Sequence, residues 1–194
     1  HPTMPRPKTS NRLLRWLLTK TVHGGILDCY LFSGMVDSVT KHVGSLLSSP
    51  SCSSEARVMV CGHSLGGALA HLSSYDLSTS LSIPPHRISC HTIGCARIFG
   101  SSAAREVEGR VPAIFNVVNG TDAIYYGGKY AHAGARHPGV PVLVDSDGLC
   151  LVRPTYVERS LTHFVWKESV MDHLTSSYAK AYRAIVEGNE ELRE

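Results

Sequence analysis

The segment Gly62-His63-Ser64-Leu65-Gly66 constrains the fold more than any other part of this sequence. It follows an apolar run over 57–61 that predicts a short buried strand, and it precedes an Ala- and Leu-rich run over 65–78 that predicts a helix. A G-x-S-x-G pattern between a strand and a helix is typical of a sharp turn that presents the serine hydroxyl above a sheet. We expect a side chain at Gly62 or Gly66 to collide with neighbouring chain in such a turn.

The rest of the chain alternates between strand and helix patterns. This alternation predicts one α/β domain, with a mostly parallel sheet flanked by helices. Asp145-Ser146-Asp147-Gly148 separates two apolar runs and predicts a hairpin turn. The other expected elements are a long amphipathic helix over 26–47, strands over 88–94 and 113–118, a short helix over 102–108, and a final helix over 169–187 that His173 opens.

Composition excludes several classes of protein. The 194 residues suffice for one domain with a sizeable core, and a net charge of +3 is too small to indicate a nucleic-acid-binding surface. No apolar run approaches the roughly 18 residues of a transmembrane helix. The six cysteines match no zinc-binding pattern, so we expect mostly free thiols, with Cys61 behaving as a small hydrophobic residue in its strand.

A serine nucleophile at position 64 needs a base, and the base needs an acid to orient it. In a fold of this kind the chain order is serine, acid, histidine. Asp122 follows the strand over 113–118 at its carboxyl end, where active sites of open α/β sheets lie; the alternative is a residue that caps its own turn. His173 is the candidate base because it follows both partners.

Other polar residues compete for these roles. We expect turn residues at Asp145 and Asp147, a solvated helix face at Asp76 and a residue that shapes the serine turn at His63. The rival candidates for the base are His163, His132 and His137.

Five ordered blocks between about residues 10 and 180 resemble the class 3 lipases, the triacylglycerol-lipase family of the α/β-hydrolase fold. The blocks cover residues 22–27, 60–70, 92–100, 116–124 and 172–174. Val60-Cys61-Gly62-His63-Ser64-Leu65-Gly66-Gly67-Ala68-Leu69-Ala70 is similar to the nucleophile block of this family almost letter for letter. Residues 139–159 look most like plant and algal members, some of which are plastid phospholipases or galactolipases.

The N-terminus departs from the family pattern. The family's Arg-Gly pair, followed by a Thr or Ser that supplies an oxyanion donor, is missing, and the nearest counterpart is Lys8-Thr9-Ser10. Ser10, with Thr9 as the alternative, is therefore the candidate donor beside the backbone N–H of Leu65. The run over 13–18 resembles a lid, or else an amphipathic segment that covers the core. Because the strands that normally come earlier are absent, we expect an N-terminally truncated sheet with an open edge.

The resemblance implies a serine esterase or lipase, with residues 1–20 as the lid and oxyanion segment and residues 21–194 as the hydrolase domain. Ser64 would form an acyl-enzyme with glycerolipid substrates at a lipid–water interface, with His173 as base and Asp122 as its orienting acid. It implies no metal and no organic cofactor, and it favours an intracellular location, in plastids or associated with lipid. The alternatives are a catalytically silent lipase-like interaction or scaffold module, and an inactive fragment of a longer lipase.

Overall fold

A five-stranded sheet forms the centre of the computed structural model, which describes residues 22–131, 134–162 and 168–191. The strands lie in the order β1-β2-β3-β4-β5. Strands β1 to β4 are parallel and β5 pairs antiparallel with β4, so the predicted, mostly parallel sheet and its hairpin are confirmed. The strands span Val58–His63, Ile88–Ile93, Ala113–Asn119, Val140–Val144 and Cys150–Val152.

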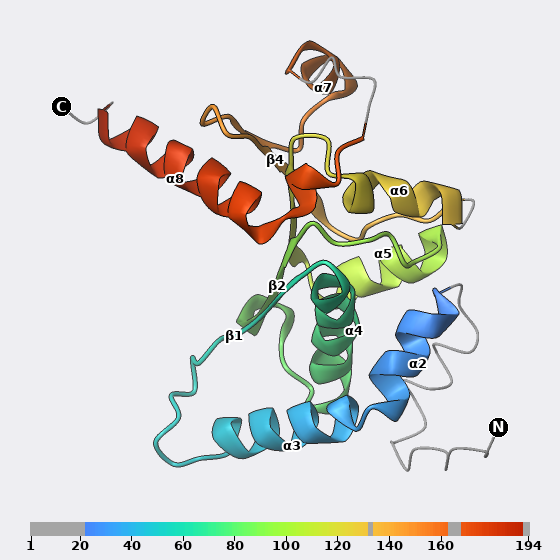
Figure 1. Cartoon of the computed structure of the whole chain (residues 1–194). Helices are drawn as coiled ribbons and strands as arrows, with labels where there is room; N and C mark the ends of the chain where they lie inside the picture. The colour runs from blue at the N-terminus through green and yellow to red at the C-terminus, as the bar shows by residue number, and fades with distance from the viewer. Residues whose placement is uncertain (1–21, 132–133, 163–167, 192–194) are drawn as a thin grey trace.

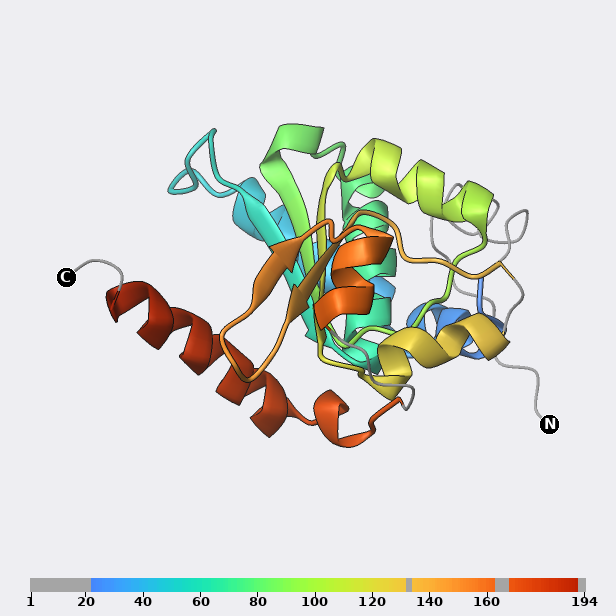
Figure 2. The same ribbon diagram turned by 90° about the horizontal axis from the view of Figure 1, so that it is seen from above.

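The helices lie in layers on the two faces of the sheet. Parallel strands that are neighbours both in sequence and in space, joined by right-handed crossovers, place their connecting helices on one face. Figure 2 shows α4, α5 and α6 on one side of the sheet and α8 on the other, while α2 and α3 pack against α4 (Figure 1). The helices span Gly24–Phe32 (α2), Met35–Leu47 (α3), Leu65–Ser80 (α4), Ser101–Arg110 (α5), Ala123–Ala131 (α6), Tyr156–Thr162 (α7) and Thr175–Glu191 (α8), with short 3-10 turns η1 at Pro85–Arg87 and η2 at Met171–His173.

Two helix predictions are wrong in their boundaries. The amphipathic pattern over 26–47 continues through a break at Ser33 and Gly34, where Gly34 has a φ of +77°, so the chain forms the separate helices α2 and α3. The final helix begins after His173, because Leu174 is extended and ends the 3-10 turn η2. The sequence patterns did not predict two further helices, α6 and α7.

Two burial predictions are also wrong. Cys61 is exposed, because β1 is the outermost strand on its side among the described residues and Cys61 points to the same open face as Met59. Asp76 is 2% exposed; it lies in α4 beneath α2 and accepts hydrogen bonds from the Tyr30 hydroxyl at 3.1 Å and the Ser80 hydroxyl at 2.7 Å. All six cysteines lie in the described residues, and each is a free thiol. No helix of the described part of the chain is both long and apolar enough to cross a membrane.

A hydrogen-bonded polar group lies fully buried between α4 and the sheet. His71 Nε2 donates to Asn116 Oδ1 at 2.9 Å, the same oxygen accepts the Thr92 hydroxyl at 2.8 Å, and Asn116 Nδ2 donates to the Pro138 carbonyl at 2.6 Å. The Cys95 thiol lies 3.7 Å from His71 Nδ1, but burial raises its pKa far above the usual range, so a thiolate nucleophile is not formed there. Burial lowers the pKa of His71 to about 4. This group is therefore a neutral part of the core.

The buried His71 makes stability depend on pH in a defined window. The unfolded chain takes up a proton at a pKa of about 6.5, whereas folded His71 resists protonation down to about pH 4, so folding stability is lost as the pH falls between these values. We expect a slope of roughly 1.4 kcal/mol per pH unit from this residue. Burial also lowers the pKa of His137, which acts in the same direction.

Urea unfolding between pH 7.5 and pH 4.5 measures this effect. His71→Gln keeps a donor toward Asn116 and should lower the pH dependence of the unfolding free energy by about 1.4 kcal/mol per pH unit, the contribution of one proton. The same change at exposed His86 should leave this pH dependence unchanged. Equal slopes for the wild type and His71→Gln would show that His71 does not cause the acid sensitivity.

Candidate active site

Ser64 lies in strained backbone between the end of β1 and the start of α4. Its φ of +55° and ψ of −124° lie outside the regions that non-glycine residues normally adopt. Hydrogen bonds hold the turn on both sides: the Ser64 N–H donates to the Ile93 carbonyl of β2 at 2.9 Å, and the Gly67 N–H donates to the Ser64 carbonyl at 3.0 Å. The sequence pattern thus folds into the sharp strand–helix turn that was predicted for it.

Two glycines make this turn, and one of them differs from the prediction. A Cβ at Gly62 would overlap the Gly66 carbonyl group and lie 2.7 Å from the Gly67 nitrogen. A Cβ at Gly67 would lie 2.9 Å from Cys95 Cβ. A Cβ at Gly66 would meet nothing within 4 Å, so the expected collision there is wrong: Gly66 faces outward in the first turn of α4, and Gly67 packs against the sheet.

The structure brings Ser64, His173 and Asp122 together, although they are far apart in the sequence. His173 Nε2 lies 2.8 Å from Ser64 Oγ, and His173 Nδ1 lies 2.9 and 3.0 Å from the two oxygens of Asp122. The carboxylate only accepts, which assigns the proton to Nδ1 and leaves Nε2 to accept the hydroxyl of Ser64. In this arrangement a neutral imidazole can take the proton of the serine.

Asp122 is fully buried and is fixed by donors on both oxygens. Its Oδ1 accepts the N–H groups of Ile124 at 2.8 Å and Tyr125 at 3.1 Å, so Asp122 also caps the first turn of α6. Its Oδ2 accepts the hydroxyl of Tyr178 at 2.7 Å. The same carboxylate therefore caps its own turn and contacts His173.

Sequence reasoning missed two residues of this site. Tyr178 of α8 donates to Asp122, and its oxygen accepts the N–H of Asn119 at 3.1 Å. Gly94, with a φ of +55°, lies under the group: a Cβ there would be 2.7 Å from Asp122 Oδ2 and 2.9 Å from His173 Nδ1. Gly94 directly follows β2, just as Gly62 directly follows the apolar run over 57–61. This similarity was a usable signal that Gly94 belongs to the site. No spacing rule indicated Tyr178.

The other candidates have different positions. His63 stacks on His173 with ring centroids 4.7 Å apart, and its Nε2 lies 3.0 Å from the His173 carbonyl oxygen, so it packs against the proposed base. His137 stacks on Tyr125 at 4.3 Å. Asp145 Oδ1 accepts the N–H groups of Asp147 and Leu149, which confirms the turn prediction. Ser10, Thr9, the lid-like run over 13–18, His132 and His163 lie outside the described residues.

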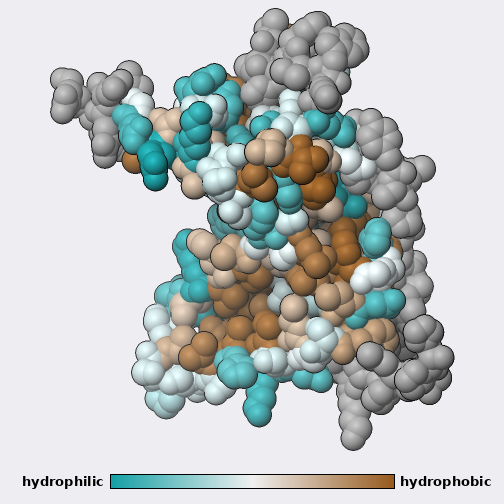
Figure 3. Space-filling view, in the orientation of Figure 1, coloured by the Kyte–Doolittle hydropathy of each residue, from teal (hydrophilic) through white to brown (hydrophobic). Residues whose placement is uncertain are grey.

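Leu65 is the first residue of α4, where backbone N–H groups have no acceptor within the helix. Its N–H is therefore available beside Ser64. Exposed apolar side chains flank the three residues of the site, and Figure 3 shows apolar surface over η2 and below it. These side chains are Leu65, Ile124, Val170, Met171 and Leu174.

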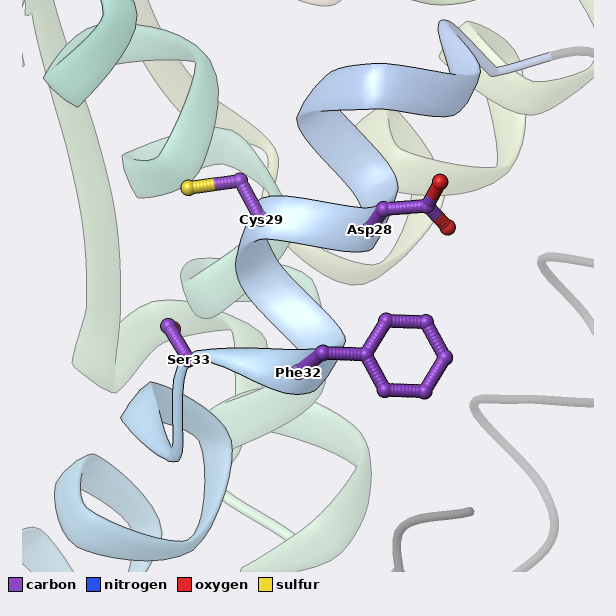
Figure 4. Close-up of a pocket in the computed structure, with 4 residues that line it drawn as sticks. All are labelled: Asp28, Cys29, Phe32 and Ser33. Atoms are coloured by element: carbon purple, nitrogen blue, oxygen red, sulfur yellow. The ribbon is translucent and has the colours of Figure 1, made fainter. Parts of the chain in front are cut away.

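An open pocket of about 500 Å³ lies on α2, away from these residues. Asp28, Cys29, Phe32 and Ser33 line it (Figure 4), and none of them is one of the three residues of the site. Within the described ranges, no group of three or more His, Cys, Asp or Glu side chains is placed to hold a metal ion.

Comparisons with known proteins show a family and similar folds. The family model Lipase (class 3) matches residues 4–125, and no curated protein matches at a significant level. A triacylglycerol lipase whose catalytic centre is formed by a serine protease triad has a similar structure, with a TM-score of 0.62 and 26% identity over 79% of this chain and 57% of that one. The lipase of Rhizopus microsporus var. chinensis (TM-score 0.62, 28% identity, 79% and 53% covered) and lipase II of Rhizopus niveus (0.61, 28%, 79% and 57%) are also similar.

A mostly parallel sheet with a serine in a strained strand–helix turn at its carboxyl end defines an α/β-hydrolase fold. The family model covers well over half of the sequence, and the chain belongs to the class 3 lipases. It spans about half the length of the lipases of known structure that it matches.

Proposed function

We propose that this protein is a serine ester hydrolase, a lipase that cleaves acyl esters of glycerolipids. The observation that carries the proposal is the continuous chain of contacts from Ser64 Oγ to His173 Nε2 at 2.8 Å and from His173 Nδ1 to Asp122 at 2.9 Å. Membership of the class 3 lipases supports it, as does the similar triacylglycerol lipase with its serine protease triad.

Each residue has a defined task in the proposed reaction. Ser64 Oγ attacks the ester carbonyl while its proton moves to His173 Nε2, and Asp122 holds the imidazole and stabilises its positive charge. The carbon–oxygen bond to the alcohol then breaks, and His173 gives the proton to the leaving alcohol. A water molecule, deprotonated by His173, then attacks the acyl carbon; the bond to Ser64 Oγ breaks, His173 returns the proton to Ser64 Oγ, and the fatty acid leaves. No step needs a metal or an organic cofactor.

The proposed oxyanion donors are the N–H of Leu65 and a group at Ser10. Two features support the Leu65 N–H as a donor: it follows the strained turn at Ser64, and it belongs to the first turn of α4, whose positive dipole end favours developing negative charge. Each donor of this kind contributes about 3 kcal/mol to transition-state stabilisation. Ser10 and the lid belong to the proposed segment 1–20, and residues 21–194 form the proposed hydrolase domain.

The proposed substrate phase is a lipid–water interface. Exposed apolar side chains adjoin all three residues of the triad, which suits an acyl chain or a lipid surface better than a dissolved polar substrate. The acidic and basic residues nearly balance, so an electrostatic attraction to nucleic acid is not part of this function.

A second candidate function is a catalytically silent module, or an inactive part of a longer lipase. The missing Arg-Gly block before Ser10 and the coverage of about half of the similar lipases favour it. The assembled contacts of Ser64, His173 and Asp122 favour the hydrolase, because a silent module needs none of them.

Hydrolysis of a p-nitrophenyl ester series from acetate to palmitate tests the proposal. We expect turnover, with a preference for longer acyl chains that shows in emulsions and in detergent-dispersed substrate. A folded protein that hydrolyses none of these esters would favour the silent module. A preference for acetate alone, with no turnover of emulsified triacylglycerol, would make the protein an esterase and contradict the assignment as a lipase.

A further inference from the structure

We propose that Asp172 is a positioning residue that fixes the distance between Asp122 and His173. It precedes His173 directly, and its contacts reach across to the loop that carries Asp122. This inference rests on the proposed function of the triad, since it assigns a role to a residue that acts through His173 and Asp122 rather than on the substrate.

One residue holds both ends of the segment that leads into Asp122. Asp172 Oδ2 accepts the N–H of Thr121 at 2.9 Å and the hydroxyl of Thr121 at 3.1 Å. The backbone carbonyl of Asp172 accepts Nδ2 of Asn119 at 3.1 Å. Hydrogen bonds to a carboxylate are stronger than those between neutral groups. The side chain and the backbone of Asp172 thus hold residues 119–121 between them.

The backbone at Gly120 allows the Asp172 carboxylate to approach closely. Gly120 has a φ of +49°, which favours glycine, and a Cβ there would lie 2.6 Å from Asp172 Oδ2 and crowd the carboxylate. Ser169 adds two further hydrogen bonds between the same two segments: its N–H donates to the Thr121 carbonyl at 2.9 Å, and its carbonyl accepts the N–H of Ala123 at 3.0 Å. Within its own segment, the Ser169 hydroxyl accepts the N–H of Asp172 at 3.2 Å.

His173 needs such contacts because no long helix holds it. It is the last residue of the three-residue turn η2, and Leu174 is extended before α8 begins at Thr175. The loop over 119–122 is 51 residues away in sequence, so only cross-contacts set its distance from η2. Because misplacement of a reacting group by about 1 Å can cost about 100-fold in rate, contacts that set this distance affect turnover.

Steady-state kinetics on a soluble ester tests the role of Asp172. We expect Asp172→Ala to lower kcat by about 10- to 100-fold with little change in KM. Asp172→Asn should retain most of the activity, because its amide oxygen still accepts both Thr121 donors. Asp147→Ala, at an exposed turn aspartate far from the triad in sequence, is the matched control and should keep the wild-type kcat. An unchanged kcat, or a raised KM alone, in Asp172→Ala would overturn the proposal.

A second readout does not depend on turnover. The proton shared by His173 Nδ1 and Asp122 gives a strongly downfield proton NMR signal, which we expect in the wild type and in Asp172→Asn and which should broaden or vanish in Asp172→Ala. Persistence of a sharp signal in folded Asp172→Ala would overturn the positioning role even if the wild type proved inactive, a result that would refute only the proposed function. If Asp172→Ala does not fold, Thr121→Val decides, with a lowered kcat supporting the role and an unchanged kcat overturning it.

Discussion

Ser64→Ala should lower the kcat for ester hydrolysis by about 10⁶-fold, with little change in KM. The change removes the oxygen proposed to form the covalent bond to the acyl group, while the apolar surroundings and the Leu65 N–H proposed to bind substrate remain. A single loss of this size is expected because the serine, the histidine and the aspartate act as one unit. Hydrolysis of p-nitrophenyl butyrate, followed at enzyme concentrations high enough to detect residual turnover, measures it.

The matched control for this variant is Ser102→Ala, at an exposed serine in the first turn of α5. It should keep the wild-type rate. Circular dichroism and urea unfolding should show that Ser64→Ala is folded, because alanine can occupy the same backbone conformation with no larger side chain. If folded Ser64→Ala retained more than a small fraction of the wild-type rate, the nucleophile would have to be another residue.

Gly62→Ala should destabilise the fold by about 3 kcal/mol or more and abolish hydrolysis. The added Cβ overlaps the Gly66 carbonyl group, which belongs to the backbone of α4 and cannot move without opening the turn that presents Ser64. Urea unfolding at neutral pH, compared with the wild type, gives the change in stability, and the ester assay gives the change in rate.

Gly66→Ala is the control that the structure offers for this change. Its Cβ meets nothing within 4 Å, and alanine is a better helix former than glycine by up to about 1 kcal/mol, so stability should be unchanged or slightly raised. Similar losses of stability in the two variants would show that the close contact at Gly62 does not hold the turn together.

Local sequence patterns predicted those structural features that depend on residues close together in the chain. The positions of the strands, the turn at Ser64 and the hairpin at Asp145 follow from short apolar runs and glycine positions, and the structure has them nearly where they were expected. The break at Gly34 was missed because the apolar spacing of 26–47 continues across it, although the backbone does not. Helix α6 was missed because Gly127 and Gly128 are poor helix formers, so Asp122 and the surrounding structure must stabilise it.

The site itself was only partly visible in the sequence. The order of serine, acid and histidine left only the histidines that follow Asp122, and the resemblance of residues 172–174 to the histidine block of the lipase family favoured His173 among them. The structure places the His173 ring between Ser64 and Asp122. The contacts of Tyr178 and Asp172 join segments more than 50 residues apart, and no local pattern encodes them. Exposure of Cys61 and burial of Asp76 were likewise missed, since they depend on which strand lies at the edge and on where α2 packs.

Treatment of the folded protein with a fluorophosphonate, followed by intact mass measurement and peptide mapping, tests the central claim most directly. Such reagents phosphonylate a serine only where a base activates it, so the reaction reports Ser64 and His173 together without any choice of lipid substrate. The triad predicts one adduct per chain, located on Ser64, and none in Ser64→Ala. A folded wild type that remains unlabelled, or an adduct on another residue, would contradict it.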